Sequence, residues 1–311
     1  MRIVFIGTGE IGLPVLDSLL NFNRHELVGV VTQPDKPAGR DQVLRPSPIK
    51  EALRDRALPI LQPPRIKHEE AIAQIRNLAP DVIVVMAYGQ ILPRAVLEIP
   101  RIACVNLHAS LLPRHRGAAP IQAAIVADDR ESGITVMYMD EGLDTGDILL
   151  QLPIEIAPDE TGESLHDRLA AIAPVALGEA LAYLCKDNAP RLPQDSSKAT
   201  YAPKLEREHG RIDWTESATV IERKIRAFNP WPGAFTNLVD SGGRMLKLKI
   251  FRATIVSGAK VGPGEVRQLN KTVMIGAKGG AVSLGEVQLE GKRRMTVAEF
   301  LRGWVGQLRV G

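Results

Sequence analysis

The sequence of 311 residues predicts an α/β protein, with a mostly parallel sheet in its N-terminal part and a smaller β-barrel domain after it. In the first half, runs rich in Val and Ile alternate with segments of helical periodicity, which is typical of a parallel sheet covered by helices on both faces. In the last third, short β-like runs follow one helix and are separated by Gly and polar turns, which favours a small barrel. We expect a first domain over 1–185, a linker over 186–206 and a second domain over 207–311.

The N-terminal domain starts with an apolar run closed by glycine, RIVFIG, and a helical pattern through Leu13, Leu16 and Leu20 follows. Further β-rich runs and helical segments continue the alternation, and the last two β-rich runs are typical of an antiparallel pair that ends the sheet. A long helix then opens at Thr161 or Gly162, either of which can cap it. In chain order, the expected elements are strands 2–7, 26–32, 81–88, 103–108, 133–140 and 147–154, and helices 47–56, 69–78 and 164–184.

The segment 186–206 is polar and rich in proline, with little periodicity, which is typical of an interdomain linker. Beyond it we expect a helix near 217–228 and then β-like runs at 235–239, 246–251, 273–276 and 281–288. This part is basic: 207–311 has 18 Lys+Arg against 9 Asp+Glu, a net of +9, whereas 1–206 has 21 against 27, a net of −6. The asymmetry suggests a polyanionic partner such as nucleic acid, although a solvated basic surface would have the same composition.

The two cysteines, Cys104 and Cys185, lie far apart and form no CxxC pair, so neither a disulfide framework nor a structural zinc site is expected. The first apolar run is too short for a signal peptide, and no apolar stretch approaches the ~20 residues that span a bilayer. We therefore expect a cytoplasmic protein without a membrane partner.

The most informative stretch is CVNLHASLLPRHRGAAP, residues 104–120, where an apolar run ends at Asn106 and His108 and a turn-rich segment begins. Side chains two residues apart on a strand point to the same face, so the amide and the imidazole should stand side by side at the carboxyl end of a strand. Open α/β sheets bind their ligands at that end. A lone histidine there is also compatible with an ordinary, hydrogen-bonded side chain beside a loop.

Two further motifs have both a structural and a functional interpretation. GTGEIG, residues 7–12, matches GxGxxG, but Asp35 lies in a Pro-rich loop beyond the position where an acid would hold a ribose hydroxyl. Tight-turn packing is therefore favoured over nucleotide binding. The acidic loop DEGLDTGD, residues 140–147, lacks the register of an EF-hand, so no metal is expected, although one of its carboxylates could work in a site.

Together these motifs resemble the folate-dependent formyltransferases. VNLHASLLPRHRGAAPIQ followed by DEGLDTGDIL matches the family's N-x-H, its SLLP turn and a downstream Asp in a GxDTG loop. Within the family, QPDKPAGR, MAYGQILP, RIDW and IRAFNPWPGAF resemble the members that formylate methionyl-tRNA. The resemblance implies a Rossmann-like N-terminal domain, an OB-like C-terminal domain that helps to hold tRNA, and catalytic roles for Asn106, His108 and Asp144.

The resemblance also implies the substrates. The formyl group of 10-formyltetrahydrofolate would pass to the α-amino group of initiator methionyl-tRNA, without a metal or NAD, and we expect the enzyme to be a monomer. Folate binding is expected from Tyr88, Gly89, Gln90, Ile91, Leu92, Ser110, Leu111, Leu112, Pro113, Met139 and Asp140. Binding of tRNA is expected from Lys36, Arg40, Arg45, Lys292, Arg293 and Arg294.

Other functions stay open from the sequence. A formyltransferase that acts on an amino sugar nucleotide or on glycinamide ribotide would share the N-x-H motif and the downstream Asp. A non-catalytic RNA-binding protein would share the basic C-terminal part, and an NAD-linked oxidoreductase would share GxGxxG. Offering each acceptor with the same formyl donor would separate the formyltransferases from one another.

The loop QPDKPAGRDQVLRPSP, residues 33–48, contains four prolines, so it can be neither a helix nor an inner strand. We expect it to be a mobile arm that orders against the acceptor end of the tRNA. Arg40 would be its main contact, because a guanidinium can both fork onto phosphate and stack on an unpaired base.

Arg40→Ala should lower kcat/KM for tRNA at least about tenfold, ~1.4 kcal/mol, with the folate KM nearly constant. Arg40→Lys should recover only part of the loss, because it keeps the charge but not the planar fork. Steady-state kinetics with each substrate varied in turn measure both effects. Wild-type kinetics in Arg40→Ala would show that the segment is only a solvated loop.

Overall fold

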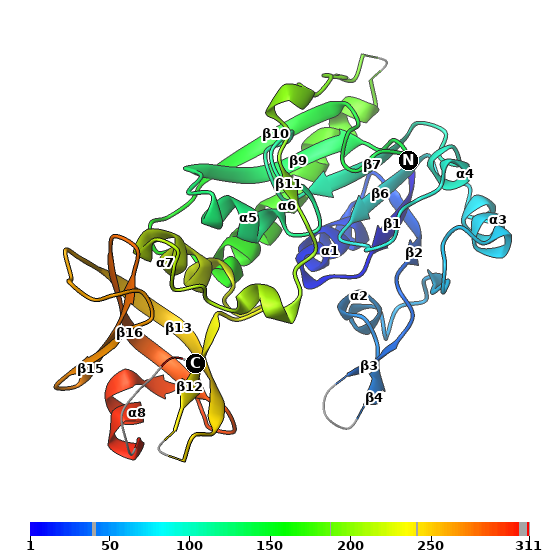
Figure 1. The fold of residues 1–311 in the computed structure, drawn as a ribbon. Coiled ribbons are helices and arrows are strands. Elements are labelled where there is room, and N and C mark those ends of the chain that lie inside the picture. The colour runs from blue at the N-terminus through cyan, green and yellow to red at the C-terminus, as the bar shows by residue number, and fades with distance from the viewer. Residues whose placement is uncertain (39–41, 187, 241, 305–309, 311) are drawn as a thin grey trace. The chain divides into compact units, whose positions relative to one another are not determined.

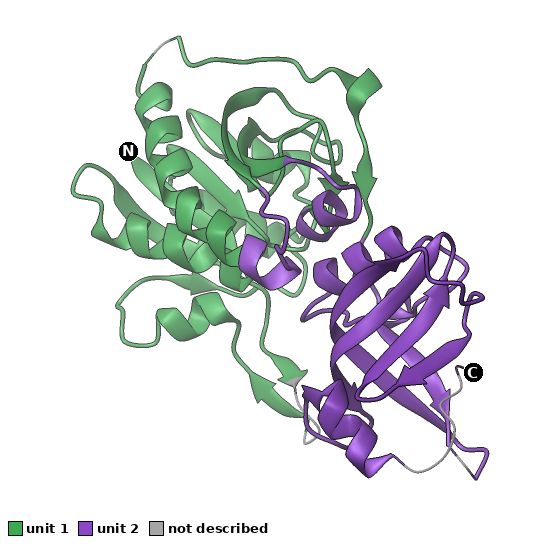
Figure 2. Cartoon of the chain, turned by 90° about the vertical axis from the view of Figure 1, so that its left-hand side faces the viewer, with its two compact units in different colours: residues 1–120, 131–155, 166–203 green, residues 121–130, 156–165, 204–311 purple. Residues whose placement is uncertain are grey.

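The computed structural model describes residues 1–38, 42–186, 188–240, 242–304 and 310. Arg40, which we expect to contact tRNA, lies outside the described residues. The described chain forms two compact units, drawn in separate colours in Figure 2. Unit 1 comprises residues 1–120, 131–155 and 166–203, and unit 2 comprises residues 121–130, 156–165 and 204–311.

Among the described residues of unit 1, seven strands form one sheet in the order β10-β9-β7-β6-β1-β2-β5 (Figure 1). The strands from β7 to β5 pair in parallel, and β9 pairs antiparallel with both β7 and β10. This is the predicted, mostly parallel α/β sheet, and each strand except β5 lies within two residues of a predicted run. The bounds are β1 Arg2–Gly7, β2 Glu26–Val31, β5 Ile60–Leu61, β6 Val82–Met86, β7 Ala103–His108, β9 Glu131–Tyr138 and β10 Ile148–Glu155.

Continuous apolar runs explain why the central strands are parallel. All five residues of β6, VIVVM, are buried, as expected for a strand covered on both faces. On one face, Ile75 of α3 and Val96 of α4 pack into a core with Ile83 and Cys104. The helices before residue 204 are η1 Glu10–Gly12, α1 Leu13–Asn21, α2 Pro48–Ala52, α3 Glu69–Asn77, α4 Arg94–Leu97, α5 Pro120–Val126, α6 Gly162–Leu184 and η2 Ser196–Lys198.

Two short strand pairs lie outside the main sheet. The proline-rich loop forms a small antiparallel hairpin, with β3 at Lys36–Ala38 and β4 at Val43–Arg45. In the second pair, β11 (Tyr201–Ala202) runs parallel to β8 (Arg116–Gly117). The segment that we expect to be a linker therefore belongs to unit 1 up to Pro203. Hydrogen bonds, rather than a periodic pattern of buried apolar residues, hold this segment in place. Its composition therefore resembles that of a linker. The predicted domain boundaries themselves stay predictions.

Unit 2 is built on an antiparallel sheet in the order β12-β13-β16-β15-β14, with β17 paired to β16. The sheet curls, as Figure 1 shows. Its core includes Trp214 and Ile225. The register of β13 shifts near Arg252, which lets this long strand bend. The small β domain agrees with the predicted fold class. The elements are η3 Arg207–Gly210, α7 Ala218–Ala227, β12 Phe235–Val239, β13 Met245–Ser257, β14 Val266–Leu269, β15 Thr272–Ala277, β16 Gly280–Leu289, β17 Met295–Thr296 and α8 Val297–Gly303.

None of the helices in the described part of the chain has the length and apolar character needed to cross a membrane.

The two cysteines differ in accessibility, which generates a test of the fold. Cys104 is buried in β7, and this burial raises the pKa of its thiol to about 12, whereas Cys185 is exposed. Because the thiolate is the reactive form, a thiol reagent at pH 8 should modify only Cys185 in the native protein and both cysteines after unfolding in guanidinium. Counting modified thiols by mass, with Cys185→Ser as the control, measures this. Equal rates for the two native cysteines would contradict the buried position of Cys104.

Candidate active site

Asn106 and His108, both on strand β7, lie close together, as their shared contact with Asp144 shows. The two-residue spacing predicts this, since alternate side chains of a strand share a face. Both side chains are buried, with exposed fractions of 9% for Asn106 and 6% for His108. Buried polar groups need partners, and here the partners come from the two segments that follow β7 and β9.

Asp144 lies in the loop between β9 and β10, and its carboxylate reaches three groups. Its Oδ2 accepts a hydrogen bond from the backbone amide of Gly117 at 2.8 Å and lies 3.6 Å from Nδ1 of His108. Its Oδ1 accepts from Nδ2 of Asn106 at 3.5 Å. The structure therefore brings together all three residues that we expect to be catalytic; their roles stay predictions.

The ring of His108 has an acceptor at each nitrogen. Nε2 lies 2.9 Å from the backbone carbonyl of His115, so this nitrogen carries the proton in the neutral ring and donates it to that carbonyl. Nδ1 then faces the Asp144 carboxylate and is the free base of the neutral ring. A proton taken up at Nδ1 would point at a carboxylate, so the geometry suits reversible proton transfer.

Hydrogen bonds within the loop that carries Asp144 help to hold its shape. Asp140 accepts hydrogen bonds from the amide of Gly142 at 3.0 Å and from the hydroxyl of Thr145 at 2.8 Å. A Cβ atom at Gly146 would lie 1.8 Å from the carbonyl oxygen of Tyr138, so only glycine fits there. Asp140 thus braces the loop, and its expected contact with folate stays a prediction.

The loop after β6 contains five of the residues that we expect to bind folate. Tyr88 and Leu92 are buried in the core beside the sheet, whereas Ile91 is 82% exposed. Gly89 has a φ of +82°, a conformation that favours glycine. Gln90 accepts a hydrogen bond from the amide of Ile66 at 3.0 Å, which ties the loop to the segment before α3.

The turn after β7 contains four more of these residues, Ser110 to Pro113. The hydroxyl of Ser110 donates to the carbonyl of Arg114 at 2.7 Å, and the amide of Leu112 donates to the hydroxyl of Thr135 on β9 at 3.1 Å. The turn is thereby fixed beside His108. The backbone amide of Met139, which we also expect to line the folate site, donates a hydrogen bond to the backbone carbonyl of Cys104 at 2.9 Å. The folate assignments of this turn and of Met139 stay predictions.

The basic residues expected to bind tRNA belong to both units. Lys36 and Arg45 are exposed and lie on the hairpin of β3 and β4. Lys292, Arg293 and Arg294 lie between β16 and β17 of unit 2, where Arg293 pairs with Glu299 and Arg294 with Glu286. Exposed ion pairs of this kind contribute little to stability, so the arginines can exchange partners readily.

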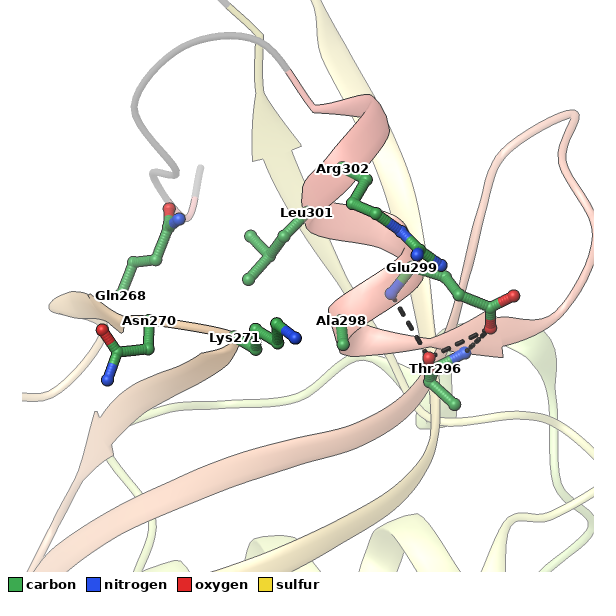
Figure 3. A pocket seen from close by; sticks show the side chains of 8 residues that line it. All are labelled: Gln268, Asn270, Lys271, Thr296, Ala298, Glu299, Leu301 and Arg302. Carbon is green, nitrogen blue, oxygen red and sulfur yellow. Dashed lines mark hydrogen bonds between the residues drawn. The ribbon is translucent and has the colours of Figure 1, made fainter.

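Unit 2 also has a pocket of about 330 Å³ beside α8 (Figure 3). It is lined in part by Lys271, Arg302 and Glu299, and none of the residues expected to bind substrate lines it. Glu299 forms a capping box with Thr296, and the hydrogen bond from the Thr296 amide, aided by Arg293, lowers the pKa of Glu299 to about 2. This acid therefore stabilises the start of α8.

The GxGxxG segment has a packing role in the structure. A Cβ atom at Gly7 would lie 2.7 Å from the Phe5 ring and 2.9 Å from the carbonyl of Met86. Asp35 is ion-paired with Lys50 at 2.8 Å and accepts from Gln62 at 2.8 Å, and these hydrogen bonds lower its pKa. Among the described residues, no group of three or more His, Cys, Asp and Glu could hold a metal ion.

Three groups of the site were missed by the sequence reasoning. Two are backbone groups, the amide of Gly117 and the carbonyl of His115, which have no signature in a sequence. The third is Gln194, whose Nε2 donates to the backbone carbonyls of Asp144 at 2.9 Å and of Gly146 at 2.8 Å. Nothing in its polar neighbourhood distinguishes it from an ordinary loop glutamine.

A Rossmann-like domain in which Asn106, His108 and Asp144 meet, followed by a small β domain, is the architecture that the motifs predict for a formyltransferase. The formyl transferase family profile matches residues 1–181, and the profile of its C-terminal domain matches residues 204–304. The chain belongs to the formyl transferase family. A methionyl-tRNA formyltransferase from Marinobacter nauticus is 47% identical over 305 residues, which cover 97% of this chain and 96% of that relative.

Solved structures share the fold at low sequence identity. A methionyl-tRNA formyltransferase from Clostridium thermocellum superposes with a TM-score of 0.57 at 19% identity, over 83% of this chain and 95% of that one. HypX from Aquifex aeolicus, solved in complex with tetrahydrofolic acid, superposes with a TM-score of 0.61 at 20% identity. That match covers 99% of this chain and 50% of HypX.

The buried hydroxyl of Tyr88 generates a stability prediction. It has no hydrogen-bond partner among the described residues, and burial raises its pKa from 10.0 to about 12. Tyr88→Phe should therefore keep or increase the free energy of unfolding at pH 8, by up to about 1–3 kcal/mol. In the wild type, the unfolded chain releases the phenol proton at a lower pH than the native chain does. Stability is therefore lost as the pH rises from about 10 towards about 12.

The phenylalanine variant lacks this loss, so its advantage should grow above pH 10. Urea unfolding at pH 8 and 10.5 measures both effects, with Tyr183→Phe as a control because Tyr183 is 39% exposed. A Tyr88→Phe protein that is less stable than the wild type at both pH values would show that the hydroxyl has a partner.

Proposed function

We propose that this chain transfers the formyl group of 10-formyltetrahydrofolate to the α-amino group of initiator methionyl-tRNA. The observation that carries the proposal is the cluster of Asn106, His108 and Asp144 in a chain that is 47% identical, over nearly its whole length, to a methionyl-tRNA formyltransferase. The tetrahydrofolic acid in the structure of HypX, which shares the fold, supports a folate as the donor.

The reaction places modest demands on the site. An α-amine has a pKa near 8, so a useful fraction is neutral and nucleophilic at pH 7. Its nitrogen attacks the formyl carbon, the bond from that carbon to the folate nitrogen breaks, the amine loses a proton and the folate nitrogen gains one. The protein must align the two substrates, stabilise the oxyanion of the intermediate and move the proton.

Each residue of the cluster suits one of these tasks. The amide of Asn106 has two N–H groups, so it can face Asp144 with one and donate the other to the oxyanion. His108 can take the amine proton at Nδ1 and return it to the leaving nitrogen, and Asp144 stabilises the charged ring in between. No step of this scheme needs a metal or a redox cofactor.

Substrate binding is assigned in the same proposal. The loop after β6, the turn after β7, and Met139 and Asp140 bind the folate, since they lie in the segments that flank the cluster. The basic 207–311 region and the hairpin of β3 and β4 bind the tRNA, consistent with the net charge of +9 in the former. We expect a cytoplasmic monomer.

The acceptor is tested directly. The purified protein is given 10-formyltetrahydrofolate with methionyl-tRNA, an amino sugar nucleotide or glycinamide ribotide, and formylated product is measured by mass. We expect turnover only with methionyl-tRNA. Turnover with another acceptor alone would replace the proposed substrate, and tRNA binding without turnover on any acceptor would favour the non-catalytic RNA-binding protein.

Substitutions in the cluster test the mechanism. His108→Ala removes the proton carrier and Asp144→Asn removes the charge that stabilises it, so each should lower kcat by roughly 10²–10³. The KM for both substrates should stay within a few-fold. His166→Ala and Asp167→Asn are matched controls, because these residues form an exposed His–Asp pair at 2.9 Å on α6. Near-normal turnover in His108→Ala would remove the proposed proton carrier.

A further inference from the structure

Beyond α6, the side chain of Gln194 holds the turn that carries Asp144. Its Nε2 donates to the carbonyls of Asp144 and Gly146, at 2.9 and 2.8 Å, and so spans the turn from one residue to the other. Its Oε1 accepts from Nε and Nη2 of Arg116 at 3.1 and 2.7 Å. Because a guanidinium only donates, Arg116 fixes which end of the amide faces the turn.

Six residues later, Thr200 holds the other partner of the catalytic ring. Its hydroxyl accepts from the amide of His115 at 2.8 Å, and its carbonyl accepts from the amide of Arg116 at 2.8 Å. His115 has a φ of +59°, which is uncommon for residues other than glycine, and its carbonyl is the acceptor for Nε2 of His108. Strand β11 follows at once and pairs with β8, which contains Gly117.

The segment 194–202, which we name the bracing segment, thus contacts both groups that flank the imidazole. Asp144 and His115 both have left-handed backbone conformations, which persist only when neighbouring groups hold them. Removing the hydrogen bond at either one lets that residue relax and changes the place of a carboxylate or a carbonyl beside His108. A displacement of about 1 Å at a reacting group can cost on the order of 10²-fold in rate.

We propose that Gln194 and Thr200 are positioning residues that hold Asp144 and the His115 carbonyl against the two nitrogens of His108, and so set the rate of proton transfer. This inference rests on the proposed function for its rate effect. The orientation of the ring is a property of the free protein and is tested without substrate.

The kinetic test compares Gln194→Ala and Thr200→Val with two variants of the same segment. Thr200→Val is nearly isosteric and removes only the hydroxyl, Thr200→Ser restores it, and Ser197→Ala removes a hydroxyl that bonds to Asp195 at 2.6 Å. We expect kcat to fall by about 10- to 100-fold in Gln194→Ala and Thr200→Val, with KM for both substrates within a few-fold. Thr200→Ser and Ser197→Ala should stay near the wild-type rate.

The second measurement is nitrogen-15 NMR of the histidine rings in the free protein. The signals of His108 are identified by their loss in His108→Ala. In the wild type, Nε2 should carry the proton, as its contact with His115 requires. Gln194→Ala and Thr200→Val should shift the ring signals of His108, whereas Thr200→Ser and Ser197→Ala should not.

The outcomes separate the two proposals. Shifted signals together with lowered kcat support the positioning roles, and the serine rescue excludes a general loss of folding. Unshifted signals, or shifted signals with an unchanged kcat, would overturn them. If the wild type does not formylate methionyl-tRNA, the proposed acceptor fails, and the same NMR comparison still decides whether the bracing segment orients His108. If Gln194→Ala does not fold, the comparison of Thr200→Val with Thr200→Ser decides whether the segment positions His108.

Discussion

The hydrogen bond from the backbone amide of Gly117 to the carboxylate of Asp144 joins the segments on which the active site depends. Gly117 can occupy this place because it has no side chain: a Cβ atom there would lie 2.6 Å from the carbonyl of Ala202, and its φ is +115°. One glycine therefore allows β11 to pair with β8 and leaves an amide free to bind the acid. Without that donor, the Asp144 carboxylate would lose its shortest hydrogen bond.

The cluster also satisfies the demands of burial. A buried amide and imidazole, and a carboxylate that is mostly withdrawn from solvent, are costly unless each is hydrogen-bonded. Here each of the three contacts another of them or a backbone group. Because water is largely excluded from the buried faces of Asn106 and His108, the charge of Asp144 acts on the ring through a medium of low dielectric constant. Burial therefore has two effects: it raises the free-energy cost of bringing these polar groups together, and it strengthens the electrostatic interactions between them.

The sequence predicts the parts of this structure that depend on periodicity. Continuous Val and Ile runs locate the main strands, and the spacing of Asn106 and His108 places two side chains of the site together. The 139–147 loop lies between two strands, and the bracing segment contains only the two-residue strand β11, so neither has such a pattern. Gln194 lies 50 residues from Asp144 and its contacts are to carbonyl groups. Backbone donors and acceptors are the same for every sequence, so only folded coordinates reveal them. Only the family resemblance singled out Asp144 from the other acids of its loop.

The GTGEIG segment shows how one motif can have two physical origins. A dinucleotide site needs these glycines so that a pyrophosphate can approach the backbone, and it needs a free acid at the end of the second strand to hold a ribose. In this chain the backbone at Gly7 is approached by the ring of Phe5 and the carbonyl of Met86, and Asp35 is bound to Lys50 and Gln62. The glycines are therefore explained by the close packing of β1 against its neighbours. The acid, and not the glycines, is therefore the part of the motif that distinguishes a dinucleotide site from a packed turn. A packed turn also requires small residues, but it does not determine what the acid contacts.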